Sequence, residues 1–140
     1  MKNVFFMVSA VLLLACSSKT ETTIVSAKSQ TMIAMKTAVN QKDADQYVKR
    51  SRDDVEIYLG PRLRIQGKQV LRENRAKHFL KHPNIKSEIQ HLVAIDDKIV
   101  MHDNVWLHDN KEGKNIVEIF SFENNEIIRV DVIQPKDLFN

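Results

Sequence analysis

The chain has 140 residues, of which 43% are hydrophobic and 28% are charged, an ordinary composition for a globular protein of one domain. Its formal net charge of +3 is too balanced for a nucleic-acid-binding protein, and no basic stripe is interleaved with aromatic residues. We therefore expect no nucleic acid partner.

The first 15 residues have the pattern of a signal peptide. Lys2 gives the segment a positive start, and residues 4–14 form an apolar run that only Ser9 and Ala10 interrupt. This run is too short to span a bilayer stably and has the length of a signal-peptide core. We expect residues 1–15 to be removed.

Cys16 is the only cysteine of the chain, and it directly follows the Leu-Leu-Ala sequence at residues 13–15. This arrangement resembles the bacterial lipoprotein signal, in which the cysteine becomes the lipidated first residue. The alternative is an ordinary secretory signal that leaves Cys16 as a free thiol, since one cysteine cannot form an internal disulfide. Lipidation predicts a membrane anchor, and Ser17 in place of an aspartate resembles the sorting pattern for the outer membrane of the cell envelope, facing the periplasm.

Residues 16–29 are rich in serine, threonine and lysine and contain few large apolar side chains. This composition is typical of a flexible tether. The alternative is an extra turn of helix from Ile24 onward. We expect the folded domain to occupy residues 30–140.

Three helices are expected in the first half of this domain. Apolar residues at spacings of three and four predict a helix over residues 30–40, and Asp43 is a suitable N-cap for a second, short helix. Gly67 precedes a third helix over residues 68–81, which Pro83 ends.

Alternating apolar residues predict strands in the rest of the domain. They cover residues 55–59, 85–95 and 99–108 and a hairpin at 114–133, with residues 62–66 as a short strand or a loop. The order helix, helix, strand, helix and then a meander of four strands predicts an α+β fold. In such a fold the helices pack on one face of a curved antiparallel sheet.

The C-terminal hairpin carries the most informative pattern. If its turn at residues 123–126 is symmetric, Glu118 faces Asp131 and Phe120 faces Arg129. This face is apolar at both ends and charged in its middle, which is typical of a pocket wall and predicts Phe120 and Arg129 as pocket residues. The opposite face carries β-branched residues, namely Val117, Ile119, Ile128, Val130 and Val132.

Two orientations of the hairpin remain open. In the first, Glu118 and Asp131 line a pocket, where one of them holds its proton or Arg129 neutralises them, and the β-branched face forms a homodimer interface because such a patch is rarely left in water. In the second, the β-branched face packs on the helices, both carboxylates lie in solvent and the protein is a monomer.

The histidines do not predict a metal site, and we expect no cofactor. Six strand residues separate His102 from His108 by about 20 Å, so the two cannot share one ion. His78 and His82 have the i, i+4 spacing of chelating residues on a helix, but no second group of ligands accompanies them. Trp106, between the first pair, is expected to fill the core or to line a pocket.

Four segments in order carry a resemblance to a known family. They read V-N-Q-K-D-A-D-Q-Y from Val39, D-D-V-E-I-Y from Asp53, I-Q-G-K-Q-V-L-R-E from Ile65 and F-E-N-N-E-I-I-R-V-D-V-I from Phe122. Over residues 30–137 the chain resembles the nuclear-transport-factor-2-like superfamily, in its SnoaL-like and ketosteroid-isomerase-like branch. The resemblance implies a conical α+β barrel of cystatin-like topology, whose curved sheet wraps around N-terminal helices and encloses a pocket.

The same resemblance implies that steroid isomerase activity is absent. Such isomerases need a tyrosine, an aspartate base and a second acid, and the matching positions here are Met35, Leu59 and Glu118. Neither Met35 nor Leu59 can take part in proton transfer, so the resemblance leaves them as pocket-lining residues.

Two functions of different classes follow from these observations. The first is a non-enzymatic envelope lipoprotein whose domain holds a small apolar ligand or a partner protein. The second is an acid–base enzyme of isomerase, cyclase or dehydratase type that uses Glu118 and Asp131 for proton transfer.

Overall fold

The computed structural model describes residues 26–108, 112–136 and 138. The predicted signal peptide, the lipidation site at Cys16 and most of the predicted tether lie outside these residues. Within the described part of the chain, no helix has the length and hydropathy needed to cross a membrane.

The elements follow in the predicted order, and residues 62–66 form a strand. In chain order they are α1 (Ala27–Gln41), α2 (Ala44–Val48), β1 (Ser51–Leu59), β2 (Arg62–Gln66), α3 (Lys68–Lys81), β3 (Lys86–Ile95), β4 (Lys98–Trp106), β5 (Lys114–Glu123) and β6 (Glu126–Ile133).

Capping residues fix the limits of the first two helices. The Ser26 side chain accepts a hydrogen bond of 3.1 Å from a backbone N–H in the first turn of α1, so this helix begins three residues before its predicted start. It ends where Lys42 adopts a left-handed conformation with a φ of 58°. Asp43 then caps α2 as predicted, and its carboxylate accepts a backbone N–H of α2 at 2.9 Å.

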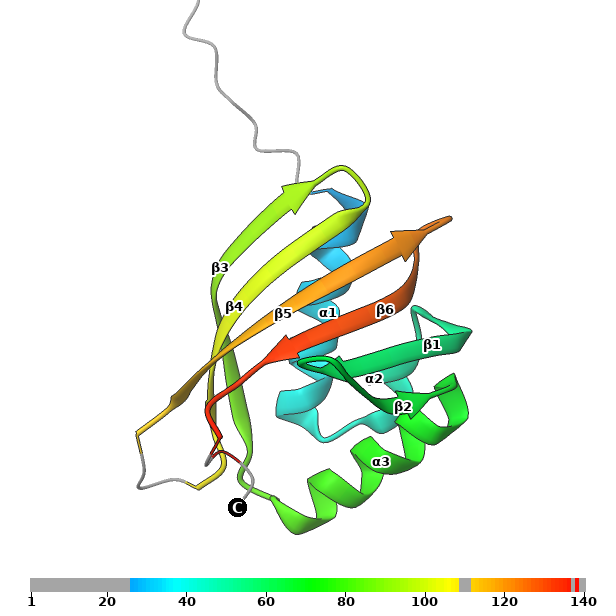
Figure 1. The fold of residues 1–140 in the computed structure, drawn as a ribbon. Helices are drawn as coiled ribbons and strands as arrows, with labels where there is room; N and C mark the ends of the chain where they lie inside the picture. The colour runs from blue at the N-terminus through cyan, green and yellow to red at the C-terminus, as the bar shows by residue number, and fades with distance from the viewer. Residues whose placement is uncertain (1–25, 109–111, 137, 139–140) are drawn as a thin grey trace, which may run out of the picture.

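The six strands form one open, curved sheet in the order β2-β1-β6-β5-β4-β3 (Figure 1). The α+β fold is confirmed, but the prediction of a purely antiparallel sheet was wrong because β1 and β6 run parallel. The chain passes through β2, α3 and the strands β3, β4 and β5 before β6 returns to β1, and this long connection lets β6 enter in the direction of β1. The other neighbouring strands are antiparallel.

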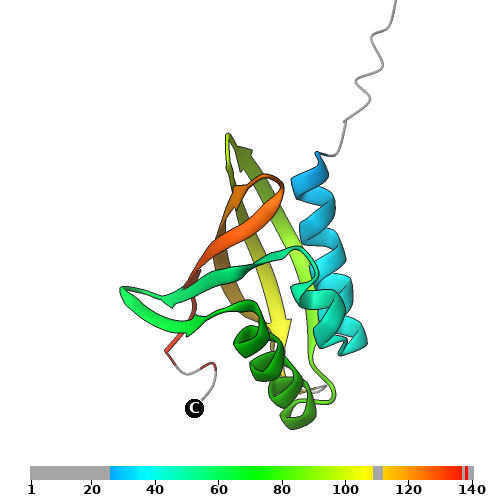
Figure 2. The ribbon, with the colours of Figure 1, turned by 90° about the vertical axis from the view of Figure 1, so that its right-hand side faces the viewer.

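The helices cover one face of this sheet, which we call the inner face (Figure 2). α1 contacts β3 and β4, whereas α3 contacts β1 and β2. The side chains with the least exposure lie between the helices and this face, and they include Met32, Val55, Ile99, Met101, Phe120 and Ile127. No helix of the described residues lies over the opposite, outer face.

A β-bulge at Ile128 changes the predicted pairing of the hairpin. Asn124 and Asn125 form the turn with φ of 50° and 63°, which suits a two-residue turn between antiparallel strands. Phe122 pairs with Ile127 as predicted, but from Ser121 onward Ile128 is skipped and Glu118 pairs with Val132. One extra residue in a strand moves all later side chains to the other face. Val130 and Val132 therefore share the inner face with Glu118.

Candidate functional site

A buried ion cluster lies between α1 and the inner face of the sheet. Lys36 of α1 places its Nζ 2.7 Å from Glu118 Oε2 of β5 and 2.9 Å from Asp103 Oδ2 of β4. Lys36 is 8% exposed, Glu118 9% and Asp103 0%. Charged groups are almost never buried to this degree unless they are paired, so these three form one unit.

Hydrogen bonds extend this cluster to β3. The Ser87 hydroxyl donates to Asp103 Oδ2 at 2.6 Å. The Asn40 side chain in turn holds the Ser87 backbone, donating to its carbonyl at 2.9 Å and accepting its N–H at 2.8 Å. The network therefore ties α1 to the three consecutive strands β3, β4 and β5.

The charges of the cluster keep Lys36 protonated. Burial by itself lowers the pKa of a lysine, but the carboxylates of Glu118 and Asp103 outweigh this effect and raise the pKa of Lys36 above its ordinary value. Burial also raises the pKa of the nearby Tyr47. Asp103 Oδ1 is buried without a hydrogen-bond partner among the residues that the structure describes.

The positions of Asp103 and Lys36 in the sequence carry a signal for this cluster. Asp103 occupies an inward position of its strand, between the buried Met101 and Val105. Lys36 follows Met32 by four residues and therefore falls on the buried stripe of α1. An unpaired buried charge costs much free energy. A lysine and an aspartate that both stand at core positions are therefore expected to pair with each other.

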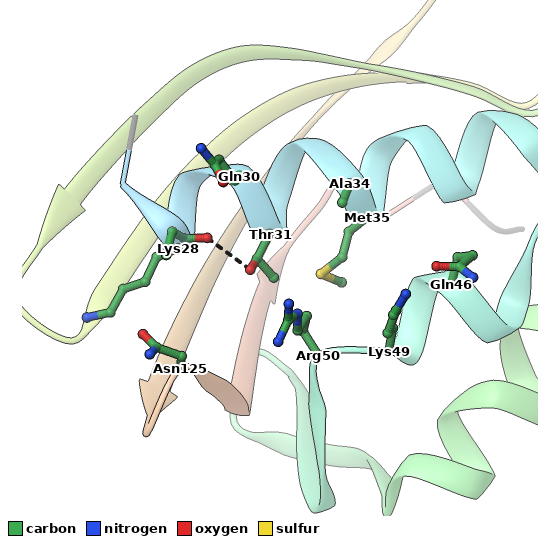
Figure 3. Close-up of a pocket in the computed structure, with 10 residues that line it drawn as sticks. Lys28, Gln30, Thr31, Ala34, Met35, Gln46, Lys49, Arg50 and Asn125 are labelled. Atoms are coloured by element: carbon green, nitrogen blue, oxygen red, sulfur yellow. Dashed lines mark hydrogen bonds between the residues drawn. The ribbon is translucent and has the colours of Figure 1, made fainter. Parts of the chain in front are cut away.

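A cavity of about 470 Å³ lies beside the first half of α1 (Figure 3). It is enclosed by α1, the end of α2 with the residues that follow it, and the turn between β5 and β6. Its lining consists of Ala27, Lys28, Gln30, Thr31, Ala34, Met35, Gln46, Lys49, Arg50 and Asn125.

The cavity is cationic rather than apolar. Its lining includes Lys28, Lys49 and Arg50, and none of the described residues that line it is acidic. Lys28 Nζ donates to the Asp96 carbonyl at 2.6 Å and lies 5.7 Å from the centre of the Phe122 ring. This lining differs from the apolar pocket that the hairpin pattern predicted.

The predicted pocket residues occupy different parts of the fold. Met35 lines this cavity and is 4% exposed, whereas Phe120 is a fully buried core residue. Leu59 is half-buried and pairs with Val132. Trp106 lies half-buried on the outer face, with Lys86 Nζ 5.4 Å from its ring centre.

The predicted pairing of Glu118 with Asp131 was wrong, because the bulge turns Asp131 to the outer face. There Arg129 binds both oxygens of Asp131, at 2.9 and 2.7 Å. The Arg129 guanidinium lies 3.9 Å from the centre of the Tyr58 ring, and Tyr58 donates to Glu56 at 3.0 Å. Arg129 therefore neutralises Asp131, as one of the sequence-based alternatives proposed, but away from the interior.

The histidines lie in two separate groups. His78, His82 and His108 approach one another near the end of α3, with centre distances of 4.7 Å and 6.0 Å between consecutive rings. His102 lies on the outer face, with its Nδ1 3.1 Å from Nδ1 of His91. Among residues 26–108, 112–136 and 138, no group of three histidine, cysteine, aspartate or glutamate side chains is placed so that it could hold a metal ion.

Comparisons with known proteins identify the fold, although no protein family model and no curated protein matches the sequence. An uncharacterized cystatin-fold protein from Novosphingobium aromaticivorans is 27% identical, with a TM-score of 0.70 over 78% of this chain and 98% of its own. A SnoaL-like protein of unknown function from Burkholderia thailandensis is 17% identical, with a TM-score of 0.69 over 78% and 94%. An NTF2-like protein of unknown function from Cytophaga hutchinsonii is 12% identical, with a TM-score of 0.64 over 81% and 94%.

Proposed function

We propose a binding function for this chain, which has the NTF2-like fold of the SnoaL-like proteins. Its domain holds a small molecule in the cavity beside Met35 and does not catalyse a reaction. The observation that carries this proposal is the separation of the cavity from the acids of the interior. Neither Glu118 nor Asp103 lines the cavity, and both bind Lys36 instead.

The described lining of the cavity lacks the carboxylates and histidines that most often carry out proton transfer. A general acid or base must lie within hydrogen-bond reach of its substrate and titrate near the working pH. None of the ten lining residues is an aspartate, glutamate, histidine, cysteine or tyrosine. Lys36 is no substitute, because its pKa is raised and it cannot give up its proton near neutral pH.

The second candidate is an acid–base enzyme, and the unpartnered Asp103 Oδ1 favours it. A buried carboxylate oxygen without a partner is costly, and a substrate donor could satisfy it. In such an enzyme Asp103 and Glu118, which both bind Lys36, would transfer protons. Asp103 would then replace Asp131, which was predicted for this role. Access for a substrate would require α1 to move away from the sheet.

We also propose that the protein is a lipoprotein anchored through Cys16 to the outer membrane and facing the periplasm. The sequence of residues 1–16 supports this anchor. The start of α1 at Ala27 leaves ten residues between the lipid and the cap at Ser26, which span at most about 35 Å when extended. Ala27 also lines the cavity, so the cavity lies at the end of the domain that the tether enters.

We also propose that the protein forms a homodimer through the outer face of its sheet. The residues of this interface differ in part from those that the sequence predicted. Val117 and Ile119 lie on this face as predicted, whereas Ile128 is the bulged residue and the shift in register moves Val130 and Val132 inward. Val93, Ile95 and Ile133 add to the apolar surface, with exposed fractions of 50%, 58% and 59%. An apolar patch of this kind is typical of an interaction surface.

Native mass spectrometry of full-length protein released from membranes tests ligand binding. We expect a copurified small molecule on the wild type and none on Ala34→Trp, because Ala34 is an exposed lining residue of α1 and the indole would fill the cavity. Ile33→Trp is the matched control, since Ile33 is 49% exposed on the same helix but does not line the cavity. A ligand that stays bound to Ala34→Trp as well as to the control contradicts the proposed site.

A further inference from the structure

We propose that the ligand of this cavity is a small amphiphile, and that Lys49 and Arg50 bind its carboxylate or phosphate group. This inference rests on the proposed function and adds the chemical class of the ligand. It follows from three features of the cavity, which are its uncompensated charge, the arrangement of its donors and its short apolar wall.

The cations of the cavity lack the carboxylate partners that other cations of this protein have. Arg52, Arg72 and Arg129 each bind an aspartate, and Lys36 binds two carboxylates. Of the ion pairs between residues that the structure describes, none includes Lys28, Lys49 or Arg50. Three like charges around one cavity repel each other, and an anion between them removes that repulsion.

The donors surround the cavity on two sides. Figure 3 shows Arg50 in the centre, with Lys28 and Asn125 on one side and Lys49 and Gln46 on the other. A guanidinium presents a planar fork that matches the two oxygens of a carboxylate or phosphate. The amides of Asn125 and Gln46 supply further N–H donors. In Figure 3 the Lys28 side chain points away from Arg50, and its Nζ binds the Asp96 carbonyl. An anionic group at Arg50 therefore has Lys49 on one side and Asn125 on the other.

The remaining wall fits a short apolar body. Ala27, Ala34 and Met35 contribute apolar surface, and Met35 is the most deeply buried of them. A volume of about 470 Å³ falls within the range of ordinary small-molecule sites. The cavity therefore suits a ligand with one charged end and a few carbon atoms, rather than a wholly apolar ligand or a bare ion.

Two sources can supply such a ligand. One is a soluble organic acid or phosphate ester, and the other is an anionic lipid, which the predicted anchor at Cys16 would bring close to the cavity. Both present the same chemistry to Arg50. The experiment therefore first tests whether the ligand needs a negative charge, and then whether it is a soluble molecule or a lipid.

Calorimetry on full-length protein in phosphatidylcholine nanodiscs, with empty nanodiscs subtracted, separates these questions. The probes are octanoate and its neutral counterpart octanol. We expect octanoate to bind more tightly than octanol, to lose at least tenfold in affinity with Arg50→Gln or Lys49→Gln, and to weaken as salt rises. Lys77→Gln removes the same charge from an exposed site on α3, and it should leave octanoate binding unchanged.

The outcomes distinguish the ligand class from the function itself. If octanol binds as well as octanoate and Arg50→Gln changes neither, the anionic ligand is overturned while the ligand-binding function stands. If neither probe binds and no molecule copurifies with the wild type, the proposed function fails as well. Competition by phosphatidylglycerol in the nanodiscs would identify the lipid as the source, whereas its failure to compete with octanoate would identify a soluble acid; either result supports the inference.

Discussion

Lys36 and Glu118 are 82 positions apart in the sequence, yet Lys36 Nζ lies 2.7 Å from Glu118 Oε2 inside the domain. This contact joins the first helix to the hairpin at the other end of the chain. With Asp103 at 2.9 Å from the same Nζ, it holds α1 against the middle of the sheet.

Lys36→Met should destabilise the domain by about 3–5 kcal/mol, the cost of leaving a buried charge without its partner. Both Glu118 and Asp103 would then lie buried without a cation. The free energy of unfolding in urea measures this effect, with Lys77→Met on the surface of α3 as the control. The triple variant Lys36→Met, Asp103→Asn, Glu118→Gln removes all three charges, and it should regain part of the loss. Equal stability of Lys36→Met and the wild type would contradict a structural role for the cluster.

The stabilisation by Lys36 should persist into alkaline solution. The folded-state pKa of Lys36 is raised above its ordinary value of 10.5, so its contribution is complete below pH 10.5 and is lost only as the pH rises through the folded-state value. Measured from pH 7 to pH 10, the stability difference between wild type and Lys36→Met should therefore stay constant. If the stability difference disappeared within this range, Lys36 would lose its proton below pH 10, and the ion pairs would not raise its pKa.

His78 should make the domain less stable in mild acid. Burial, followed by the charges of Arg75, His82 and Lys81, lowers the folded-state pKa of His78 from 6.5 to about 4. Between these values the unfolded chain binds a proton that the folded chain does not, so stability should fall as the pH drops from 6.5 to 4. We expect a loss of about 1–2 kcal/mol, since the ring is partly exposed and solvent screens its interactions.

Urea unfolding at pH 7 and pH 4.5 measures this loss. His78→Gln should reduce the difference between the two pH values, and His91→Gln, at an exposed position on β3, should leave it unchanged. The same pH dependence in wild type and His78→Gln would assign the acid sensitivity to other groups.

Substitutions on the outer face should disrupt the proposed homodimer. Val93 is 50% exposed and neighbours Val100, which in turn neighbours Ile119. Sedimentation of residues 26–140 should show a dimer for the wild type and a folded monomer for Val93→Lys or Ile119→Lys, because a lysine in an apolar contact must lose its hydration. Ile33→Lys on α1 is the control and should remain dimeric. A monomeric wild type would disprove the interface.

Lipidation at Cys16 is tested in a Gram-negative host. The wild type should incorporate a labelled fatty acid and partition into detergent, and Cys16→Ser should lose both properties because the acyl chains need the thiol. Equal labelling of the two proteins would show that Cys16 is not the attachment site.

Local patterns in the sequence predicted most of the fold. The N-cap at Asp43 and the bounds of α3 were predicted correctly, since capping and helical periodicity act within a few residues. The Asn124–Asn125 turn was also correct, because asparagine tolerates the positive φ that such a turn needs. The sequence did not reveal the parallel pairing of β1 with β6, which depends on contacts between distant segments.

The candidate site was harder to predict than the fold. Period-2 alternation grouped Glu118 with Phe120 on one face, but it left open whether that face packs on the helices. It also assumed an unbroken register and so placed Asp131 beside Glu118. The bulge at Ile128 has no sequence signature of its own here, and it reverses the faces of every residue after it. Lys36 and Asp103 were missed because the core position of each was not compared with that of the other, although tertiary packing then brings the two side chains together.

The position of β6 between β1 and β5 affects how the protein reaches its final form. β1 begins at Ser51 but gains its parallel neighbour only when the last strand, which ends at Ile133, is present. The pairing of β1 with β6 therefore cannot form until β6 has been synthesised, and pairings between segments so far apart in the sequence form slowly. We therefore expect slow folding after synthesis, which would suit the export that the predicted signal peptide implies.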